Sequence, residues 1–239
     1  LDQRAEELGV FGYDPRHLTW KQVGPWKVRY SADREAYNQA SGKRDIMKVN
    51  PSTIPPAYNH RKNYNVFRER GGSGEVLLDL VVEGEHIAIF INKFPSVRYH
   101  MLIVPEPEQE HVQSFNELAL ETIRKLRKLS RSPGLKVGFN PWGGLASINH
   151  LHFQANYYEE KMPIEMATRV GVSDGIFQLE DYPARALAFE LEDERSRRLF
   201  LSFVRLLQQG DIVHPISLIG DTLYVWPAVL KIEEHEFMD

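Results

Sequence analysis

The sequence predicts an α+β protein in which short strands form an antiparallel sheet and two amphipathic helices pack against it. Three observations support this fold class. Apolar runs of strand length recur from residue 76 onward, two longer segments carry apolar residues at helical spacing, and one order of strands and helix occurs twice. The 239-residue chain is 42% hydrophobic, which is enough for a conventional core.

The N-terminal region is polar and irregular. Pro51, Pro55 and Pro56 indicate extended arms and loops up to about residue 65. We therefore divide one compact domain into three parts, which are an N-terminal arm (1–70), a first unit (71–160) and a degenerate second unit (161–239).

The first unit opens at the turn signal 71–74, where glycine dominates. Its helix is expected to begin at Ser114, which forms a capping box with Glu117, and to stop at Pro133 and Gly134. Strands flank this helix on both sides, and the expected elements are strands at 76–82, 87–91 and 99–104, a helix at 114–131, and strands at 135–139 and 146–157.

The second unit repeats this order. Its helix opens with Glu192, Asp193 and Glu194, which favour the positive end of the helix dipole, and it ends at Gly210. The final hairpin turns at residues 220–221 and carries no histidine pair. The expected elements are strands at 175–179 and 185–190, a helix at 192–209, and strands at 213–219 and 222–229.

The segment 146–157 is the strongest candidate for chemistry. Read as a strand, it places His150, His152 and Gln154 on one face and Leu151 and Phe153 on the other. Imidazoles and a carboxamide are costly to bury without partners, so the polar face indicates a binding or catalytic surface. An isolated His-x-His pair would more often be a satisfied polar patch.

A neutral imidazole attacks phosphorus well when a carbonyl holds one of its nitrogens. His152 is the best placed for this role, with His150 and Gln154 about 7 Å away on either side. The amides of Gly143 and Gly144 and the hydroxyl of Ser147 are expected to complete a phosphate cradle. Since a carboxamide cannot protonate a departing group, Gln154 favours transfer with a good leaving group.

This segment resembles the histidine triad superfamily, in the branch whose motif reads HxHxQ. That branch holds galactose-1-phosphate uridylyltransferase, dinucleoside tetraphosphate phosphorylases and GDP-hexose phosphorylases, and the stretch 146–155 is most similar to the last of these. Further similarity lies at 91–95, 99–105 and 182–190. The resemblance implies a HIT-like half-barrel with a degenerate second HIT-like unit over residues 76–230.

The resemblance also implies roles for individual residues. His152 would be the nucleophile that takes the nucleoside monophosphate, while His150 and Gln154 contact the phosphates, and Asn92 would bind the ribose. Lys93 is a further phosphate candidate, although a solvated loop charge is the competing interpretation for Lys93, as it is for Arg98. The phosphate loop would be formed by Asn140, Gly143, Gly144 and Ser147.

The implied reaction is phosphorolysis, in which GDP-hexose and phosphate give GDP and hexose 1-phosphate through a nucleotidyl-histidine. A dinucleoside polyphosphate phosphorylase or a uridylyl- or adenylyltransferase of the same superfamily is the alternative. No cofactor is expected to be required, and Mg²⁺ is expected only as a companion of the nucleotide. The expected partners are a nucleotide sugar, inorganic phosphate and, for assembly, a second copy of the chain.

Two other classes compete with this hypothesis. The spacing of Gly144, His150 and His152 matches the opening of the cupin metal motif, with Glu159 as a carboxylate, but Glu159 lies too far along the chain and no second cupin motif follows. An RNA binder would use aromatic and basic residues of the N-terminal arm, although no single-strand motif is present. Those residues are Tyr58, Arg61, Lys62, Tyr64, Phe67 and Arg68.

Charge and composition limit the location and the partners that we expect for this chain. The formal charge of -4 gives no global attraction to nucleic acid, and the basic residues between 124 and 131 read as the solvated side of a helix. The chain has no cysteine, no apolar run of membrane-spanning length and no signal-peptide pattern at its first residues. A cytoplasmic location without membrane or nucleic-acid partners is therefore expected.

Overall fold

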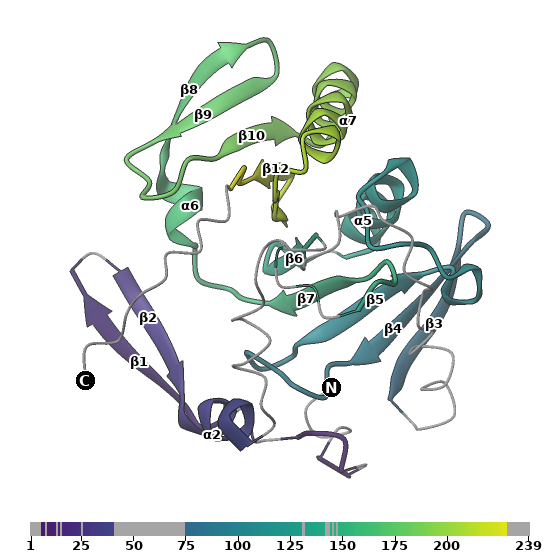
Figure 1. Cartoon of the computed structure of the whole chain (residues 1–239), viewed down its shortest axis with the longest axis vertical. Coiled ribbons are helices and arrows are strands. Elements are labelled where there is room, and N and C mark those ends of the chain that lie inside the picture. The colour runs from purple at the N-terminus through teal and green to yellow at the C-terminus, as the bar shows by residue number, and fades with distance from the viewer. Residues whose placement is uncertain are drawn as a thin grey trace.

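A ten-stranded sheet and a separate two-stranded hairpin organise the chain (Figure 1). The computed structural model describes residues 6–7, 9–12, 14, 16–24, 26–40, 75–130, 132–141, 144, 146 and 148–228. The aromatic and basic residues of 58–68, on which the RNA hypothesis rested, lie outside these ranges, as do Gly143 and Ser147.

The elements from residue 75 onward follow one order twice, with three strands, a helix and two strands in each half. The first half contains β3 (Val76–Val82), β4 (Glu85–Ile91), β5 (Met101–Pro105), α5 (Glu117–Leu129), β6 (Leu135–Phe139) and β7 (Phe153–Tyr157). The second half contains β8 (Thr168–Ser173), β9 (Ile176–Glu180), β10 (Leu187–Glu190), α7 (Glu194–Gln209), β11 (Ile216–Ile219) and β12 (Thr222–Val225).

The sheet order is symmetric about its centre. It runs β3-β4-β5-β7-β6-β11-β12-β10-β9-β8, and each neighbouring pair is antiparallel. The two halves therefore meet where β6 pairs with β11, with Phe139 opposite Ile216. Reading outward from this seam, each half has the same succession of strands. The observed architecture is the α+β fold with a large antiparallel sheet that the sequence predicts.

Several elements escaped the sequence analysis. The edge strand β8 is exposed along its whole length, so it carries no burial pattern. The N-terminal arm, expected to be loops, forms a hairpin and a helix, and α6 is a single turn before β8. These further elements are β1 (Leu18–Val23), β2 (Trp26–Ser31), α2 (Ala32–Ala40), η2 (Pro107–Gln109) and α6 (Pro163–Met166).

The first amphipathic helix begins later than the capping box predicts. Asn116, not Ser114, is the N-cap, and its side-chain oxygen accepts a hydrogen bond from the Ala119 amide at 3.0 Å. The second helix has Asp193 as its N-cap, which accepts from the Ser196 amide at 2.6 Å. This cap lies within the acidic run that the sequence analysis singled out.

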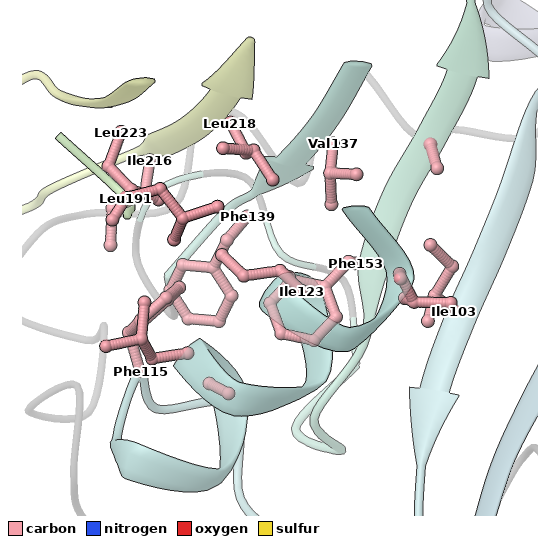
Figure 2. Close-up of a cluster of buried hydrophobic side chains, with 14 of the residues drawn as sticks. Ile103, Phe115, Ile123, Val137, Phe139, Phe153, Leu191, Ile216, Leu218 and Leu223 are labelled. Atoms are coloured by element: carbon pink, nitrogen blue, oxygen red, sulfur yellow. The ribbon is translucent and has the colours of Figure 1, made fainter. Parts of the chain in front are cut away.

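Helices α5 and α7 lie on one face of the sheet and share its core (Figure 1). Figure 2 shows Phe115, Ile123, Phe139 and Phe153 gathered between α5 and the sheet. The Phe115 ring meets the rings of Phe139 and Phe200 edge to face, with centroids 5.3 Å apart in each pair. Because Phe200 belongs to α7, this aromatic cluster joins the two halves.

The opposite face differs between the halves. In the second half, Ile164 of α6 and Tyr224 of β12 pack together there and are fully buried. The β11–β12 connection is the tight turn at Gly220 and Asp221, whereas the β6–β7 connection runs through residues 140–152. Of these two connections, the long one is therefore β6–β7.

None of the helices in the described ranges is long and apolar enough to cross a bilayer.

Removal of the Phe200 ring is expected to lower the free energy of unfolding by about 3–5 kcal/mol, because the ring is fully buried in the aromatic cluster. Phe200→Ala and the wild type would be compared by urea denaturation. The matched control is Leu206→Ala on the same helix, where the side chain is 65% exposed and the expected change is within about 0.5 kcal/mol. Equal losses in the two variants would contradict the assigned core.

Candidate active site

The histidine segment is only partly a strand. β7 begins at Phe153, and residues 148–150 form a bend before it, so the strand expected at 146–157 is too long. Leu151, Phe153 and Ala155 enter the core on the helix side. Gln154 pairs with Leu102 and Gly138 in the sheet, and its half-buried side chain lies on the opposite face. The predicted alternation therefore holds in β7, while His150 precedes the strand.

His152 is held in one orientation. Its side chain is 6% exposed, and its Nδ1 lies 2.8 Å from the carbonyl oxygen of His150. Because a carbonyl only accepts, Nδ1 carries the proton and donates it, and Nε2 keeps its lone pair. This arrangement gives His152 the tautomer that a nucleophile toward phosphorus requires.

His150 is buried directly ahead of the strand. Burial is the main cause that lowers its pKa to about 4, and the neighbouring His152 contributes to this lowering. The ring is therefore neutral near pH 7. Its contact with phosphate stays a prediction. In this structure the carbonyl of His150 contributes to the site by orienting His152.

Gln154 has His100 as a neighbour, a buried residue directly before β5. The Ser96 amide donates to His100 Nδ1 at 2.9 Å, so the proton of the neutral ring is on Nε2. His100 is also hydrogen-bonded to Gln154. Gln154 and His100 therefore lie side by side.

Burial is the main cause of the low pKa of His100, which is about 4, while the hydrogen bond to Gln154 opposes it. Arg34 and Arg29 lower the pKa as well. Both arginines belong to the N-terminal hairpin and helix, so this arm brings positive charge toward the face that carries Gln154. The hairpin is joined to the first half by Lys27 and Glu160, whose charged atoms are 3.0 Å apart.

Asn92 and Lys93 follow β4. The Asn92 side-chain oxygen accepts from the Phe94 amide at 2.9 Å, and its nitrogen lies 3.2 Å from His100 Nε2. The structure therefore brings Asn92, His100 and Gln154 together. The Lys93 side chain is exposed, and its carbonyl accepts from the Gly12 amide at 2.8 Å.

The described part of the predicted phosphate loop packs against the second half. The Gly144 amide donates to the Pro141 carbonyl at 2.9 Å. A Cβ at Gly144 would lie 2.9 Å from Pro141 and 3.0 Å from Val213, so only glycine fits without a shift. Asn140, half-buried, directly follows β6. The phosphate contacts expected of Asn140 and Gly144 stay a prediction.

Gln113 lies in the loop before α5, is 2% exposed, and was not predicted from the sequence as part of the site. Its side chain contacts the backbone of both His152 and Asn140. No pattern around it indicates this role, because the contact joins residues far apart in the sequence.

In the described part of the chain, the histidines form no cluster of metal-ligating side chains and do not line the apolar cavity of the first half. Among the described residues, no three His, Asp or Glu side chains come close enough to hold a metal ion. The sheet order also differs from the jelly roll of a cupin, because helices α5 and α7 cover one face of one continuous sheet. An apolar cavity of about 340 Å³, lined by Ile89, Met101, Ile103 and Tyr157 among others, opens on the helix side of the sheet, away from Gln154.

Comparison with known proteins decides the family. The model of the GDPGP1-like N-terminal domain matches residues 2–156. The chain belongs to the GDPGP1-like family. This confirms the resemblance that the HxHxQ segment carries.

Curated relatives agree with this assignment. The chain is 34% identical over 197 residues to GDP-D-glucose phosphorylase 1 of Homo sapiens, which covers 77% of this chain and 48% of that protein. It is 31% identical over 107 residues to GDP-L-galactose phosphorylase 2 of Arabidopsis thaliana, covering 43% and 25%. This member of the GDPGP1-like family thus spans about half the length of the human relative.

Solved structures confirm the fold. Yeast Ap4A phosphorylase Apa2 in complex with AMP superimposes with a TM-score of 0.59 at 17% identity, covering 96% of this chain and 80% of that one. The same enzyme in complex with Ap4A gives a TM-score of 0.56 at 17% identity, covering 94% and 79%. This GDPGP1-like chain therefore has the HIT-like α+β fold.

Acid is expected to destabilise this chain through His100. Below pH 6.5 the unfolded state binds a proton at this residue, while the folded ring stays neutral down to about pH 4. The contribution of His100 to the free energy of unfolding is therefore fully present above about pH 6.5. It is lost as the pH falls toward 4, and the loss is at most about 3 kcal/mol.

Urea unfolding at pH 7.5 and pH 5 would measure this loss in the wild type and in His100→Asn, in which it should be smaller. His17→Asn, on the surface, controls for the removal of one imidazole. An unchanged loss between the two pH values in His100→Asn would show that His100 is not the acid-sensitive group.

Proposed function

We propose that this chain transfers a nucleotidyl group from GDP-hexose to inorganic phosphate and releases GDP and hexose 1-phosphate. Its membership of the GDPGP1-like family supports this assignment. The observation that carries the chemistry is the tautomer of His152, in which Nδ1–H donates to the His150 carbonyl at 2.8 Å and Nε2 keeps its lone pair.

In the first step, Nε2 of His152 attacks the α-phosphorus of GDP-hexose. A bond forms between Nε2 and phosphorus, and the bond from the α-phosphorus to the bridging oxygen breaks. The electron pair leaves with hexose 1-phosphate, which is a stable anion and needs no proton. GMP is then joined to His152, whose Nδ1–H remains bonded to the His150 carbonyl and so stabilises the positive ring.

In the second step, an oxygen of inorganic phosphate attacks the same phosphorus. The bond from phosphorus to Nε2 breaks, GDP leaves and the neutral ring of His152 is restored. The Gln154 NH₂ group donates to the phosphate oxygens in both steps. The predicted roles of Asn92 toward ribose and of the 140–147 loop toward phosphate belong to the same proposal.

The proposal keeps the expectations drawn from composition and resemblance. It places the reaction in the cytoplasm, requires no cofactor, and allows Mg²⁺ to accompany the nucleotide. The whole activity is assigned to a chain that spans about half of its human relative, so the measurement must be made on this chain itself.

A second candidate is phosphorolysis of dinucleoside polyphosphates. The fold likeness to yeast Ap4A phosphorylase favours testing it, since the same histidine chemistry would serve with a nucleotide as the leaving group. The two candidates differ in the group that departs in the first step and share the intermediate on His152.

The test is to incubate the chain with phosphate and a panel of nucleotide sugars and dinucleoside polyphosphates, and to identify products by mass spectrometry. GDP and hexose 1-phosphate are expected from GDP-hexoses. His152→Ala should lower this rate at least about a thousandfold, because the nucleophile is lost. His17→Ala, an exposed histidine of the N-terminal arm, is the control and should keep the wild-type rate.

Two results would contradict the proposal. Turnover of dinucleoside polyphosphates alone would favour the second candidate. Equal rates in His152→Ala and the wild type would remove His152 as the nucleophile, whichever substrate reacts.

A further inference from the structure

The strands β6 and β7 separate at the residues that matter for the reaction. Their ladder pairs Gly138 with Gln154 and ends there. In the same register Phe139 would lie opposite Phe153, and Asn140 and His152, which directly follow and precede the two strands, would lie opposite each other one position further on. The backbone of His152 therefore lacks the β6 neighbour that residues 154–157 of β7 have.

The side chain of Gln113 occupies this position. Its Oε1 accepts a hydrogen bond from the His152 amide at 2.8 Å. Its Nε2 donates to the His152 carbonyl at 3.0 Å and to the Asn140 carbonyl at 2.9 Å. One carboxamide thus binds both backbone groups of His152 and connects them to the end of β6, in the place of a missing rung of the ladder.

Gln113 is itself fixed from two directions. Its backbone amide donates to Asn149 Oδ1 at 3.0 Å, and the Leu151 amide donates to the His111 carbonyl at 2.6 Å. Residues 111–113 therefore run beside residues 149–152 and hold them by three sets of contacts. The 2% exposure of Gln113 keeps water from replacing its hydrogen bonds.

The second half of the chain supports the same loop. Gln208 of α7 donates to the Phe115 carbonyl at 2.8 Å and to Ser114 Oγ at 3.3 Å. The Phe115 ring packs edge to face on Phe200 of the same helix. Helix α7, which carries no residue of the proposed reaction, therefore fixes the two residues that follow Gln113.

We propose that Gln113 is the positioning residue of the nucleophile, and that α7 serves the reaction through it. Gln113 fixes the peptide groups on both sides of the His152 Cα, and this fixes the direction in which Nε2 points. The inference rests on the proposed function for its kinetic consequence. Its structural part, the orientation of the His152 ring, stands independently of the substrate.

Glutamine is the side chain that this position demands. It must accept from one N–H and donate to two carbonyl oxygens at once, and a carboxamide does both. A glutamate of the same length could accept from the His152 amide but would face the His152 and Asn140 carbonyls with negative charge. Methionine has a similar length and makes none of these hydrogen bonds.

The kinetic test compares Gln113→Met with the wild type at a temperature where both are folded by circular dichroism. The expected kcat falls about 10- to 100-fold, as for a displaced catalytic group, while KM for GDP-hexose stays within about twofold. Gln109→Met, an exposed glutamine of the same loop, is the matched control with wild-type kinetics. An unchanged kcat in folded Gln113→Met would overturn the proposal.

Gln113→Glu adds a pH readout that a purely structural role would not give. Its kcat relative to the wild type should rise as the pH is lowered, because a protonated carboxyl can donate to one of the two carbonyls. Gln113→Met should show no such rise. The same relative pH profile in both variants would contradict the assigned hydrogen bonds.

Nitrogen NMR of ¹⁵N-histidine-labelled chain separates failure of this inference from failure of the proposed function. In the wild type, the His152 ring should show protonated Nδ1 and unprotonated Nε2, and Gln113→Met should shift this signal toward a mixture of tautomers. An identical signal in Gln113→Met refutes the positioning role even if no GDP-hexose reacts. If no GDP-hexose reacts but the His152 signal shifts as expected in Gln113→Met, only the proposed substrate is refuted.

Gln208→Met provides a second route if the Gln113 variants fail to fold. It should lower kcat by a smaller factor than Gln113→Met and shift the His152 signal in the same direction. Gln209→Met, the exposed neighbour on α7, should do neither. Wild-type kcat and an unshifted signal in Gln208→Met would contradict the role given to α7.

Discussion

The separation of β6 from β7 beyond Gly138 and Gln154 is the constraint on which the site depends. A regular ladder would continue through Asn140 and His152 and would leave no room for the long connection between the two strands. The ladder instead ends, and residues 140–152 connect β6 to β7. The side chain of Gln113 restores the lost backbone hydrogen bonds, so His152 remains fixed although the ladder has ended.

The core between the sheet and the helices stabilises this arrangement. Phe139 directly precedes Asn140, Phe153 directly follows His152, and both rings meet Phe115 edge to face. Gln113, Asn140 and His152 are therefore each one or two positions from a buried aromatic ring. The second half of the chain contributes Phe200 and Gln208 to the same region. Its own β11–β12 connection is a tight turn, which explains why it can pack and support but carries no equivalent histidine pair.

The sequence predicts the parts of this site that are local. The apolar residues Leu151 and Phe153 lie in the core as alternation requires, and Gln154 lies on the other face. His150 lies in the bend at 148–150, beside the 111–113 loop, and this contact between distant segments is not contained in strand periodicity; the role of His150 toward phosphate stays a prediction. Strand periodicity cannot predict the roles of Gln113 and His100 either, because their partners His152 and Gln154 lie 39 and 54 positions away in the sequence.

Fold prediction succeeds and fails for a similar reason. The sheet strands other than β8 and the two main helices follow from apolar spacing, since each of these elements buries one face. The strand β8 and the β1–β2 hairpin bury little, so they leave no pattern to read. The N-cap of α5 is Asn116, because its side chain reaches the Ala119 amide. The capping-box spacing alone predicted the neighbouring polar residue Ser114.

The central claim is that Nε2 of His152 carries the nucleotidyl group, and trapping of that intermediate tests it most directly. The chain would be mixed with GDP-hexose in the absence of phosphate, quenched under alkaline conditions that preserve phosphorus–nitrogen bonds, and analysed by intact-mass and peptide mass spectrometry. The account predicts one GMP per chain on the peptide that contains His152, which is lost as GDP when phosphate is added. Turnover without such an adduct, or an adduct on a different residue, would contradict it.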